Sequence, residues 1–147
     1  MRKNFPYIWE VYLIVLKNNK ILLLRRANTW YYDGQYSLPA GHMEGHETPT
    51  EAIIRETGEE IGINTLPSQL WSPLTVFRMC ADGIDNERFE IFFPLIQRDG
   101  EIKNNEPHKC DDLARYDINN LPENTIPYIR ESIKAYISGK SFIEIIE

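Results

Sequence analysis

The chain has 147 residues, the length of one ordinary domain, so we expect a single domain over residues 1–147. Hydrophobic residues make up 42% and charged residues 26%, which excludes collagen-like, disordered and membrane-spanning classes. Sixteen basic against 22 acidic residues leave a net charge of −6, which argues against binding nucleic acid or an anionic membrane by bulk electrostatics. An anionic substrate would therefore need a bound cation, most simply a metal ion.

Cysteine usage and the N-terminal stretch indicate the compartment. Cys80 and Cys110 lie 30 residues apart and form no CxxC motif, so neither a disulfide framework nor a cysteine-rich zinc site is expected. Glu10 interrupts the first apolar stretch, and no small-residue cleavage site follows it. We therefore interpret this stretch as a strand and expect a cytoplasmic protein.

The first elements are two apolar runs and a loop. The runs 8–16 and 20–25 are rich in leucine and β-branched residues, and they flank the Asn18-Asn19 pair. This pattern predicts a hairpin whose two asparagines adopt positive φ at the turn. An aromatic-rich loop is expected at 28–35, followed by a short strand at 36–38.

The next element is the best-marked helix of the chain. Thr48 suits the N-cap, Pro49 suits the first helical position, and Glu51 completes a capping box. Gly62 is a natural residue just after a helix, so the helix should run from Pro49 to Ile61. The helical period places four residues on one side, namely Ile53, Ile54, Thr57 and Ile61.

The second half alternates strands, a loop and a helix. Strands are predicted at 74–81 and 88–96, and a polar loop at 99–107. A helix should begin at 126 or 127, end at 138, and be followed by a last strand at 141–147. Strands and hairpins flanking two helices predict a mixed α/β or α+β sheet sandwich.

Acidic residues are concentrated on the first helix. Six glutamates and one basic residue, Arg55, lie between Glu44 and Glu60. Glu56, Glu59 and Glu60 have the spacing i, i+3, i+4, so they leave one face of the helix and repel one another. Either water solvates this face, or its oxygens hold a hard divalent cation such as Mg²⁺.

The residues around this cluster favour the cation. The sequence reads Gly41, five residues, Glu47, seven residues, then Arg55-Glu56-Thr57-Gly58-Glu59-Glu60-Ile61-Gly62-Ile63. This resembles the Nudix box, G-x5-E-x7-R-E-U-x-E-E-x-G-U, of the Nudix hydrolase superfamily, and all seven fixed positions match. An accidental match in such a chain is on the order of one in a million. The resemblance departs at Thr57, which occupies an apolar position, and it is looser outside 41–63.

The resemblance implies an α/β/α sandwich around a mixed sheet, with a loop–helix–loop at 41–63. It also implies divalent ions, Mg²⁺ or Mn²⁺, held at Gly41 (backbone carbonyl), Glu56, Glu59 and Glu60. Glu56 is a candidate base toward the attacking water, Arg55 would orient it, and Glu47 would support Arg55. Glu106 is our candidate for a further acid outside the box, although a solvated loop glutamate explains it equally well.

Five residues are candidates for binding substrate. His42 could touch a phosphate, and MutT-type relatives place an arginine near the phosphates where this chain has Arg25. Trp30 and Tyr32 could stack on a base, or the loop could simply pack its own aromatic rings. Asn124 falls where such relatives read a purine edge, but an asparagine before a helix is more commonly an N-cap.

These observations predict a metal-dependent pyrophosphohydrolase acting on a nucleoside diphosphate linked to another group. The default is a MutT-like enzyme that converts a (d)NTP to monophosphate and pyrophosphate, with 8-oxo-dGTP as one target. An ADP-ribose or nucleotide-sugar pyrophosphatase is the alternative, although Phe77 and Arg78 stand where that branch usually has a proline. A catalytically silent nucleotide-binding module is a second alternative, against which the intact glutamates argue. We expect a small-molecule nucleotide as partner, and a monomer or homodimer.

Overall fold

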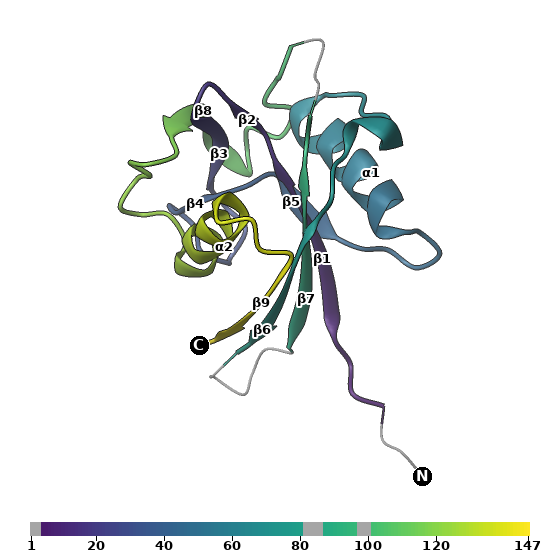
Figure 1. The fold of residues 1–147 in the computed structure, drawn as a ribbon. Coiled ribbons are helices and arrows are strands. Elements are labelled where there is room, and N and C mark those ends of the chain that lie inside the picture. Colours follow the sequence, from purple (N-terminus) through teal and green to yellow (C-terminus); the bar gives the residue numbers. More distant parts are fainter. Residues whose placement is uncertain (1–3, 81–86, 97–100) are drawn as a thin grey trace.

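The computed structural model describes residues 4–80, 87–96 and 101–147 (Figure 1). Two helices and nine strands are found within these residues, together with a short 3₁₀ turn at Pro67–Gln69. In chain order the elements are β1 (Ile8–Ile14), β2 (Leu16–Lys17), β3 (Lys20–Arg26), β4 (Tyr36–Ser37), β5 (Ala40–His42), α1 (Pro49–Ile61), β6 (Leu74–Met79), β7 (Arg88–Pro94), β8 (Cys110–Asp117), α2 (Pro127–Ile137) and β9 (Phe142–Ile146).

The strands form two sheets. The larger sheet has the order β5-β1-β7-β6-β9, and it is mixed because β1 and β7 are parallel, as are β6 and β9. The smaller sheet has β3 at its centre, paired with β2, β4 and β8. The sequence analysis assigned no strand to β8, because its many charged residues hide the apolar period of a half-buried strand.

The predicted hairpin is confirmed at its turn and corrected in its first arm. Asn18 and Asn19 adopt φ values of 53° and 60°, and β2 pairs with β3 across them. However, the run 8–16 breaks between β1 and β2, and β1 pairs with β5 and β7 in the other sheet. The single run 8–16 thus contributes one strand to each of the two sheets.

Helix α1 has the predicted bounds, Pro49–Ile61. The Thr48 hydroxyl accepts a hydrogen bond from the Glu51 amide, and the Glu51 carboxylate accepts one from the Thr48 amide. The chain leaves the helix through Gly62 with φ 69°, a conformation that glycine adopts without strain. Thr57 is buried, and its hydroxyl donates to the carbonyl of Ile53 at 2.7 Å, so a hydroxyl is accommodated at this apolar position.

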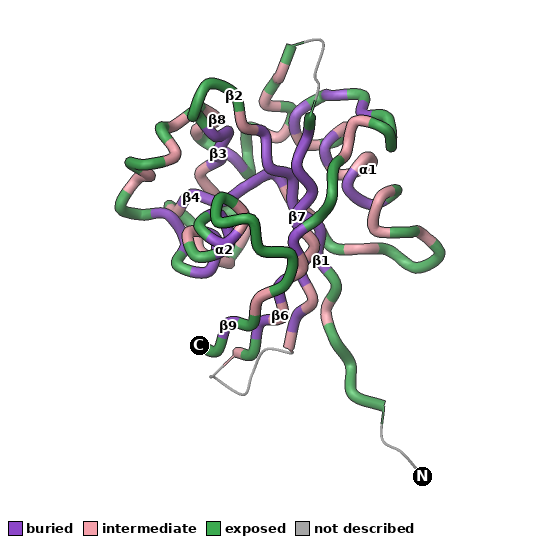
Figure 2. The backbone as a smooth tube through the Cα atoms, in the orientation of Figure 1, coloured by how far each residue is buried: buried purple, intermediate pink, exposed green. Residues whose placement is uncertain are grey.

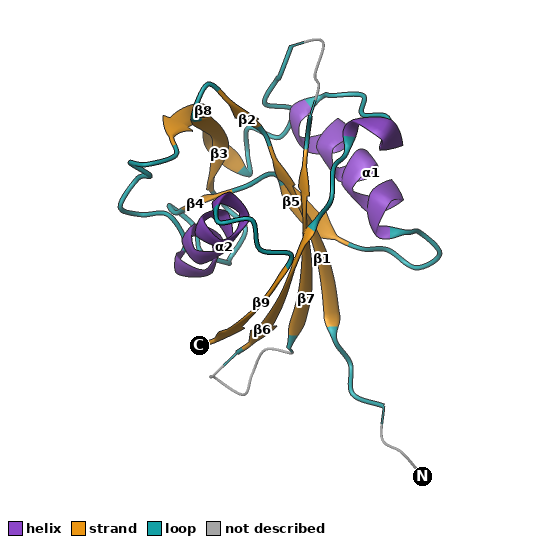
Figure 3. Ribbon diagram, viewed as in Figure 1, coloured by secondary structure: helices purple, strands orange, loops and turns teal. Residues whose placement is uncertain are grey.

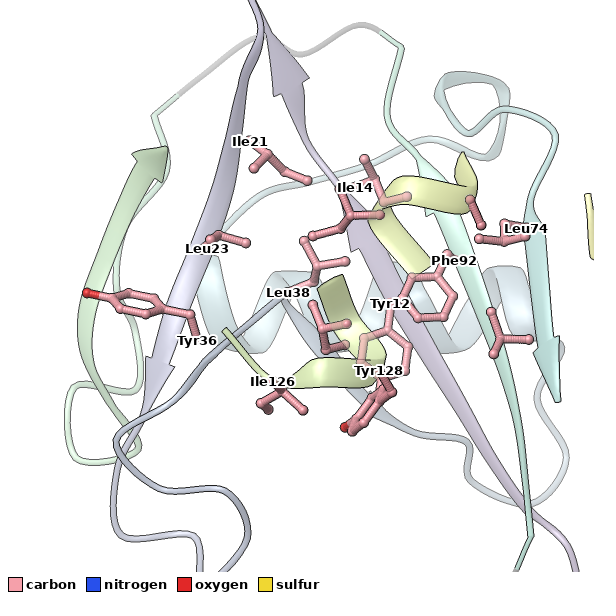
Figure 4. Close-up of a cluster of buried hydrophobic side chains, with 14 of the residues drawn as sticks. Tyr12, Ile14, Ile21, Leu23, Tyr36, Leu38, Leu74, Phe92, Ile126 and Tyr128 are labelled. Carbon is pink, nitrogen blue, oxygen red and sulfur yellow. The ribbon is translucent and has the colours of Figure 1, made fainter. Parts of the chain in front are cut away.

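The two helices lie on opposite sides of the sheets (Figures 1 and 3). Along β1, Val11 and Leu13 join the cluster under α1, whereas Tyr12 and Ile14 join the cluster under α2. Figure 4 shows the second cluster, and Figure 2 shows the buried segments running between the helices. The predicted helix–sheet–helix sandwich is therefore confirmed.

Other boundaries differ slightly from the predictions. The predicted strand 74–81 ends at Met79, and residue 81 lies outside the described residues, as do residues 99–100 of the predicted loop. The strand 88–96 ends at Pro94. Helix α2 is capped by Ile126, so the N-cap interpretation of Asn124 is wrong, because Pro127 fixes the first helical residue two positions later. Among the described helices, none combines the length and apolar character needed to cross a membrane.

Candidate active site

A cleft of about 710 Å³ opens between the sheets beside α1. It is bounded by α1, by β5, by the end of β3 and by the loop that precedes β8. Seven of the residues singled out in the sequence line it, namely Gly41, His42, Arg55, Glu56, Glu59, Glu60 and Glu106. Residues 65 positions apart in the chain thus meet on one concave surface.

Arg55 joins the carboxylates of this cleft. Its Nε and Nη2 donate to both oxygens of Glu47, at 3.0 and 2.7 Å, in a bidentate pair. Its Nη1 donates to Glu56 Oε1 at 2.7 Å, and its Nη2 also reaches the carbonyl of His42 at 3.1 Å. The hydrogen bonds from Arg55 lower the pKa of Glu47 to about 2, so this pair remains ionised throughout the range in which proteins are folded. Arg55 therefore holds Glu56 between the helix and β5.

Gly41 is required by the close approach of Glu56. A Cβ atom at this position would overlap the carboxyl group of Glu56. The approach is enforced by the sheet, because Gly41 is paired with Val11 in the antiparallel ladder of β5 and β1. The backbone of Gly41 and the carboxylate of Glu56 are thereby brought together in the cleft.

Like charges crowd the inner end of the cleft. Burial, and then the neighbouring charges of Glu56 and Glu106, raise the pKa of Glu60 to about 8, although its Oε2 accepts a hydrogen bond from the Ala40 amide. Burial also raises the pKa of Glu56, and the charges of Glu59 and Glu106 add to that rise. Glu106 is partly offset by Lys109, whose Nζ lies 3.3 Å from its carboxylate. The cleft therefore contains more negative charge than its own basic residues neutralise.

This donor set fits a hard divalent cation. Carboxylate and carbonyl oxygens are the ligands of Mg²⁺ and similar ions, and a bound cation would offset the mutual repulsion of these acids. Within the described part of the chain, no three acidic, histidine or cysteine side chains already converge as a coordination shell. Arg55 accounts for part of this separation, because it holds one oxygen of Glu56.

The raised pKa of Glu60 predicts a pH-dependent stability in the absence of metal. The folded state keeps the proton up to about pH 8, whereas the unfolded state loses it near 4.5. The free energy of unfolding should therefore fall as pH rises between these values. In EDTA, we expect thermal melts of Glu60→Gln to lose several degrees less in Tm between pH 5.5 and 8.5 than the wild type does.

A matched control is Glu131→Gln, which changes an exposed glutamate on α2. This variant should keep the pH dependence of the wild type. Excess Mg²⁺ at pH 8.5 should raise the Tm of the wild type but not that of Glu60→Gln. Identical pH profiles for Glu60→Gln and the wild type would contradict the assignment of this raised pKa.

Four residues singled out for substrate do not line the cleft. Arg25 forms an ion pair with Asp111 at 2.7 Å on the surface. Asn124 donates from Nδ2 to the carbonyl of Gly34 at 2.8 Å. The ring of Tyr32 packs edge-on against Tyr31 and Tyr128, and Trp30 is 98% exposed. Glu47 likewise lies behind Arg55 rather than on the cleft wall.

The structure brings in other residues that the sequence analysis missed. Arg26 lines the cleft instead of its neighbour Arg25, because successive side chains of β3 point to opposite faces and Arg26 shares the face of Leu24, which also lines the cleft. On the opposite wall, Glu10 Oε1 accepts a hydrogen bond from Arg88 Nη1 at 2.5 Å and pairs with His42 Nε2 at 2.8 Å. The hydrogen bond to Glu10 raises the pKa of His42. The sequence did contain a signal for these site residues, because Glu10 and Arg88 are charged residues inside strands that were predicted from apolar runs.

Comparison with known proteins gives one consistent result. The family model described as the NUDIX domain matches residues 6–136. An ADP-ribose pyrophosphatase of Methanocaldococcus jannaschii is 34% identical over 128 residues, 87% of this chain and 72% of the relative. An 8-oxo-dGTP diphosphatase of Escherichia coli is 28% identical over 77% of this chain and 85% of the relative. A MutT protein structure from Methanosarcina mazei Go1 aligns with a TM-score of 0.77 at 21% identity, covering 94% of this chain and 98% of that one.

Proposed function

Because the chain belongs to the NUDIX family of hydrolases, we propose that it cleaves the diphosphate of a nucleotide whose second phosphate carries another group. Members of this family act on small nucleotide substrates and generally use divalent metal ions. We propose Mg²⁺ or Mn²⁺ here, bound by Glu56, Glu59 and Glu60 with the Gly41 carbonyl, and with Glu106 as a further ligand. The ion would neutralise charge on the bridging oxygens and polarise the attacking water.

The observation that carries this proposal is the Arg55 network beside Gly41. Arg55 is fixed by both oxygens of Glu47, so its remaining donors hold Glu56 in one orientation. Burial raises the pKa of Glu56, which makes its carboxylate a stronger base toward a water proton. We assign Glu56 as the base and Arg55 and Glu47 as the residues that position it.

Two substrate classes are supported by different observations. A (d)NTP pyrophosphohydrolase, with oxidised purine nucleotides such as 8-oxo-dGTP among its targets, is supported by the similarity to the E. coli diphosphatase. ADP-ribose is supported by the higher identity, over more of the chain, to the M. jannaschii pyrophosphatase. Substrates of both classes contain a nucleoside diphosphate. A cleft with acids at one end and with Arg26 and Arg88 along its walls can accommodate such a group.

A substrate panel with product analysis separates the two. The purified protein is incubated with canonical dNTPs, 8-oxo-dGTP, ADP-ribose and NADH, in Mg²⁺, Mn²⁺ or EDTA. Release of pyrophosphate and a monophosphate identifies the first class, and release of AMP and ribose 5-phosphate identifies the second. Absence of metal-dependent turnover on every member would favour a catalytically silent nucleotide-binding module.

The loop between β3 and β4 supports a role for Trp30 in binding the base. Asn28, Trp30 and Tyr32 all have positive φ, at 54°, 66° and 52°, which is costly for residues other than glycine. The Asp33 carboxylate accepts a hydrogen bond from the Trp30 amide at 3.0 Å. Arg26 Nε donates to the carbonyl of Tyr31 at 2.7 Å. The loop thus holds an exposed indole in a strained conformation.

Trp30 lies between Thr29 and Tyr31, both of which line the cleft. We therefore propose that a substrate base stacks on Trp30 at the rim, while Tyr32 packs inside the loop. His42 is proposed to contact phosphate, since its imidazole lines the cleft and its protonated form is favoured by Glu10. Arg25 and Asn124 are not included in this substrate site, since they are engaged with Asp111 and with the carbonyl of Gly34.

Replacing Trp30 by glycine should raise KM about tenfold and leave kcat nearly unchanged, because base stacking contributes roughly 1–3 kcal/mol. The melting temperature should be maintained or increased, since glycine adopts the left-handed conformation without strain. Steady-state kinetics and thermal melts measure both effects. Trp71→Ala, which removes an indole that is 63% exposed elsewhere, is the control and should change neither. An unchanged KM for Trp30→Gly would exclude the stacking role.

The remaining elements of the proposal concern organisation. We propose one catalytic domain over residues 1–147, a cytoplasmic location, and neither nucleic acid nor membrane as partner. The net charge of −6 supports the last point. Cys80 and Cys110, which form no disulfide with each other, are compatible with a reducing compartment.

A further inference from the structure

Four strands of the larger sheet present apolar side chains on a face that α1 covers only in part. The register places Trp9, Phe89 and Phe77 side by side in one row across β1, β7 and β6. Helix α1 packs on the part of this face that carries Val11 and Leu13. The ends of β1, β7, β6 and β9 extend past both helices (Figure 1). A sheet face of this kind is normally buried against another layer.

The uncovered part is rich in exposed large side chains. Eleven large hydrophobic residues are exposed among the described residues, and six of them belong to this face. They are Phe5, Tyr7, Trp9, Met79, Phe142 and Ile146, with exposed fractions between 41% and 75%. We call these six, together with Phe77 and Phe89, the apolar sheet face. The strand pairing makes these residues neighbours across the sheet rather than scattered surface residues.

The aromatic rings of the apolar sheet face are already packed against one another. Trp9 stacks on Phe89 with ring centroids 4.6 Å apart and an interplanar angle of 15°. Tyr7 meets Phe89 edge-on at 5.4 Å, and Phe77 packs against Phe89 at 5.1 Å. Phe5 extends the cluster through Tyr7. A surface whose rings are held in place loses little conformational entropy when a partner covers it.

The chemistry of this face selects the kind of partner. Within β1, β6, β7 and β9, Glu144 is the one charged residue whose position in the strand alternation falls on this face. No lysine or arginine of these four strands shares it, so these strands offer no cation to phosphates or to anionic lipid headgroups. A largely apolar surface is complementary to another surface of the same kind. A second copy of this chain carries the same face and is therefore its simplest partner.

We propose that the apolar sheet face is a homodimer interface, covered by a second copy of this chain related by a two-fold axis. Six half-exposed side chains supply on the order of 600 Å² per copy, close to the roughly 800 Å² per partner of a stable interface. The cleft residues Glu10, Tyr12 and Arg88 occupy the opposite positions of the strand alternation in β1 and β7. These three residues therefore lie on the far side of the sheet from the interface, and this inference stands independently of the proposed reaction.

Sedimentation velocity from 1 to 100 µM tests the proposal. We expect the wild type to sediment as a dimer at the upper concentrations, and Trp9→Glu and Ile146→Glu to raise the dimer dissociation constant at least 100-fold. Trp71→Glu, an exposed tryptophan outside this face, is the matched control and should dimerise like the wild type. Circular dichroism establishes that each variant is folded. Ile146 is 75% exposed, so its variant carries the test if Trp9→Glu disturbs the ring cluster.

Three results would overturn the proposal. A wild type that remains monomeric at 100 µM excludes a dimer of useful affinity. A dimer that persists in both folded variants places the interface elsewhere on the molecule. A monomeric wild type that co-sediments with phosphatidylcholine vesicles, and loses this behaviour in Ile146→Glu, assigns the face to a membrane instead.

Discussion

Replacing Glu56 by glutamine should lower kcat by about 10³- to 10⁴-fold, the largest catalytic loss expected from any single substitution in this protein. The change removes the negative oxygen that faces Gly41 and accepts the hydrogen bond from Arg55. It removes, in one step, a proposed metal ligand and the proposed base. The amide retains the shape of the side chain, so the fold should be preserved.

The measurement is steady-state turnover of the substrate identified by the panel, with thermal melts in parallel. Glu131→Gln on the surface of α2 controls for loss of one acidic residue and should retain wild-type activity. The melting temperature of Glu56→Gln should not fall, because burial already raises the pKa of this carboxyl. Activity within tenfold of the wild type would assign the base and the essential ligand to other acids of the cleft.

The largest loss of stability is expected from Arg78→Met. Arg78 is 1% exposed, donates from Nε to Glu90 at 2.9 Å, and lies 3.7 Å above the ring of Tyr128. Its Nη2 also donates to the Tyr31 hydroxyl at 3.2 Å. Removing the guanidinium leaves Glu90 buried without its cation, and breaking such a pair typically costs about 3–5 kcal/mol. We expect the free energy of unfolding to fall by about 3 kcal/mol, the lower of these values, as measured by urea unfolding at pH 7.

The lower value follows from the protonation of Glu90. Burial and the neighbouring Glu10 raise the pKa of Glu90 whereas Arg78 opposes the rise, so Glu90 can become neutral when Arg78 is lost. The folded state of Arg78→Met should therefore hold this proton to a higher pH than the wild type. Its stability should therefore fall more steeply with rising pH than that of the wild type, because the unfolded state gives up this proton at lower pH.

The double variant Arg78→Met/Glu90→Gln separates charge from packing. If the uncompensated carboxyl is the cause, the second substitution should recover at least half of the lost stability and remove the additional dependence on pH. No recovery would attribute the loss to the contacts of Arg78 with Tyr31 and Tyr128 instead. The two outcomes are distinguished by the same urea titrations at pH 7 and 9.

Local features of the sequence were sufficient to predict several elements. The Thr48 capping box and Gly62 set the bounds of α1, because helix termini are determined by hydrogen bonds within a few residues. The turn at Asn18-Asn19 followed from the tolerance of asparagine for positive φ. The spacing of glutamates on one turn of α1 predicted the acidic group, and the family it resembles is the one whose model matches the chain.

Contacts between distant segments could not be predicted in the same way. The pairing of β1 with β7 aligns Glu10 with Glu90, and the pairing of β7 with β6 aligns Arg88 with Arg78, across separations that no local pattern encodes. Which arginine lines the cleft depends on which face of β3 meets it, and that is the face of Leu24 and Arg26 rather than that of Arg25. Alternation places the two arginines on opposite faces of the strand, but only the packing of the whole chain decides which of these faces meets the cleft.

The sequence by itself thus determined the helix that carries the acids, the chemistry of their oxygens and the family of the chain. Those properties reside in residues that are neighbours along the chain, where spacing and side-chain chemistry act directly. The tertiary structure decided which walls surround the acids, how Glu10, Arg88 and His42 face them, and which part of the larger sheet remains uncovered. Those properties arise from strand register and layer packing, which depend on the whole chain at once.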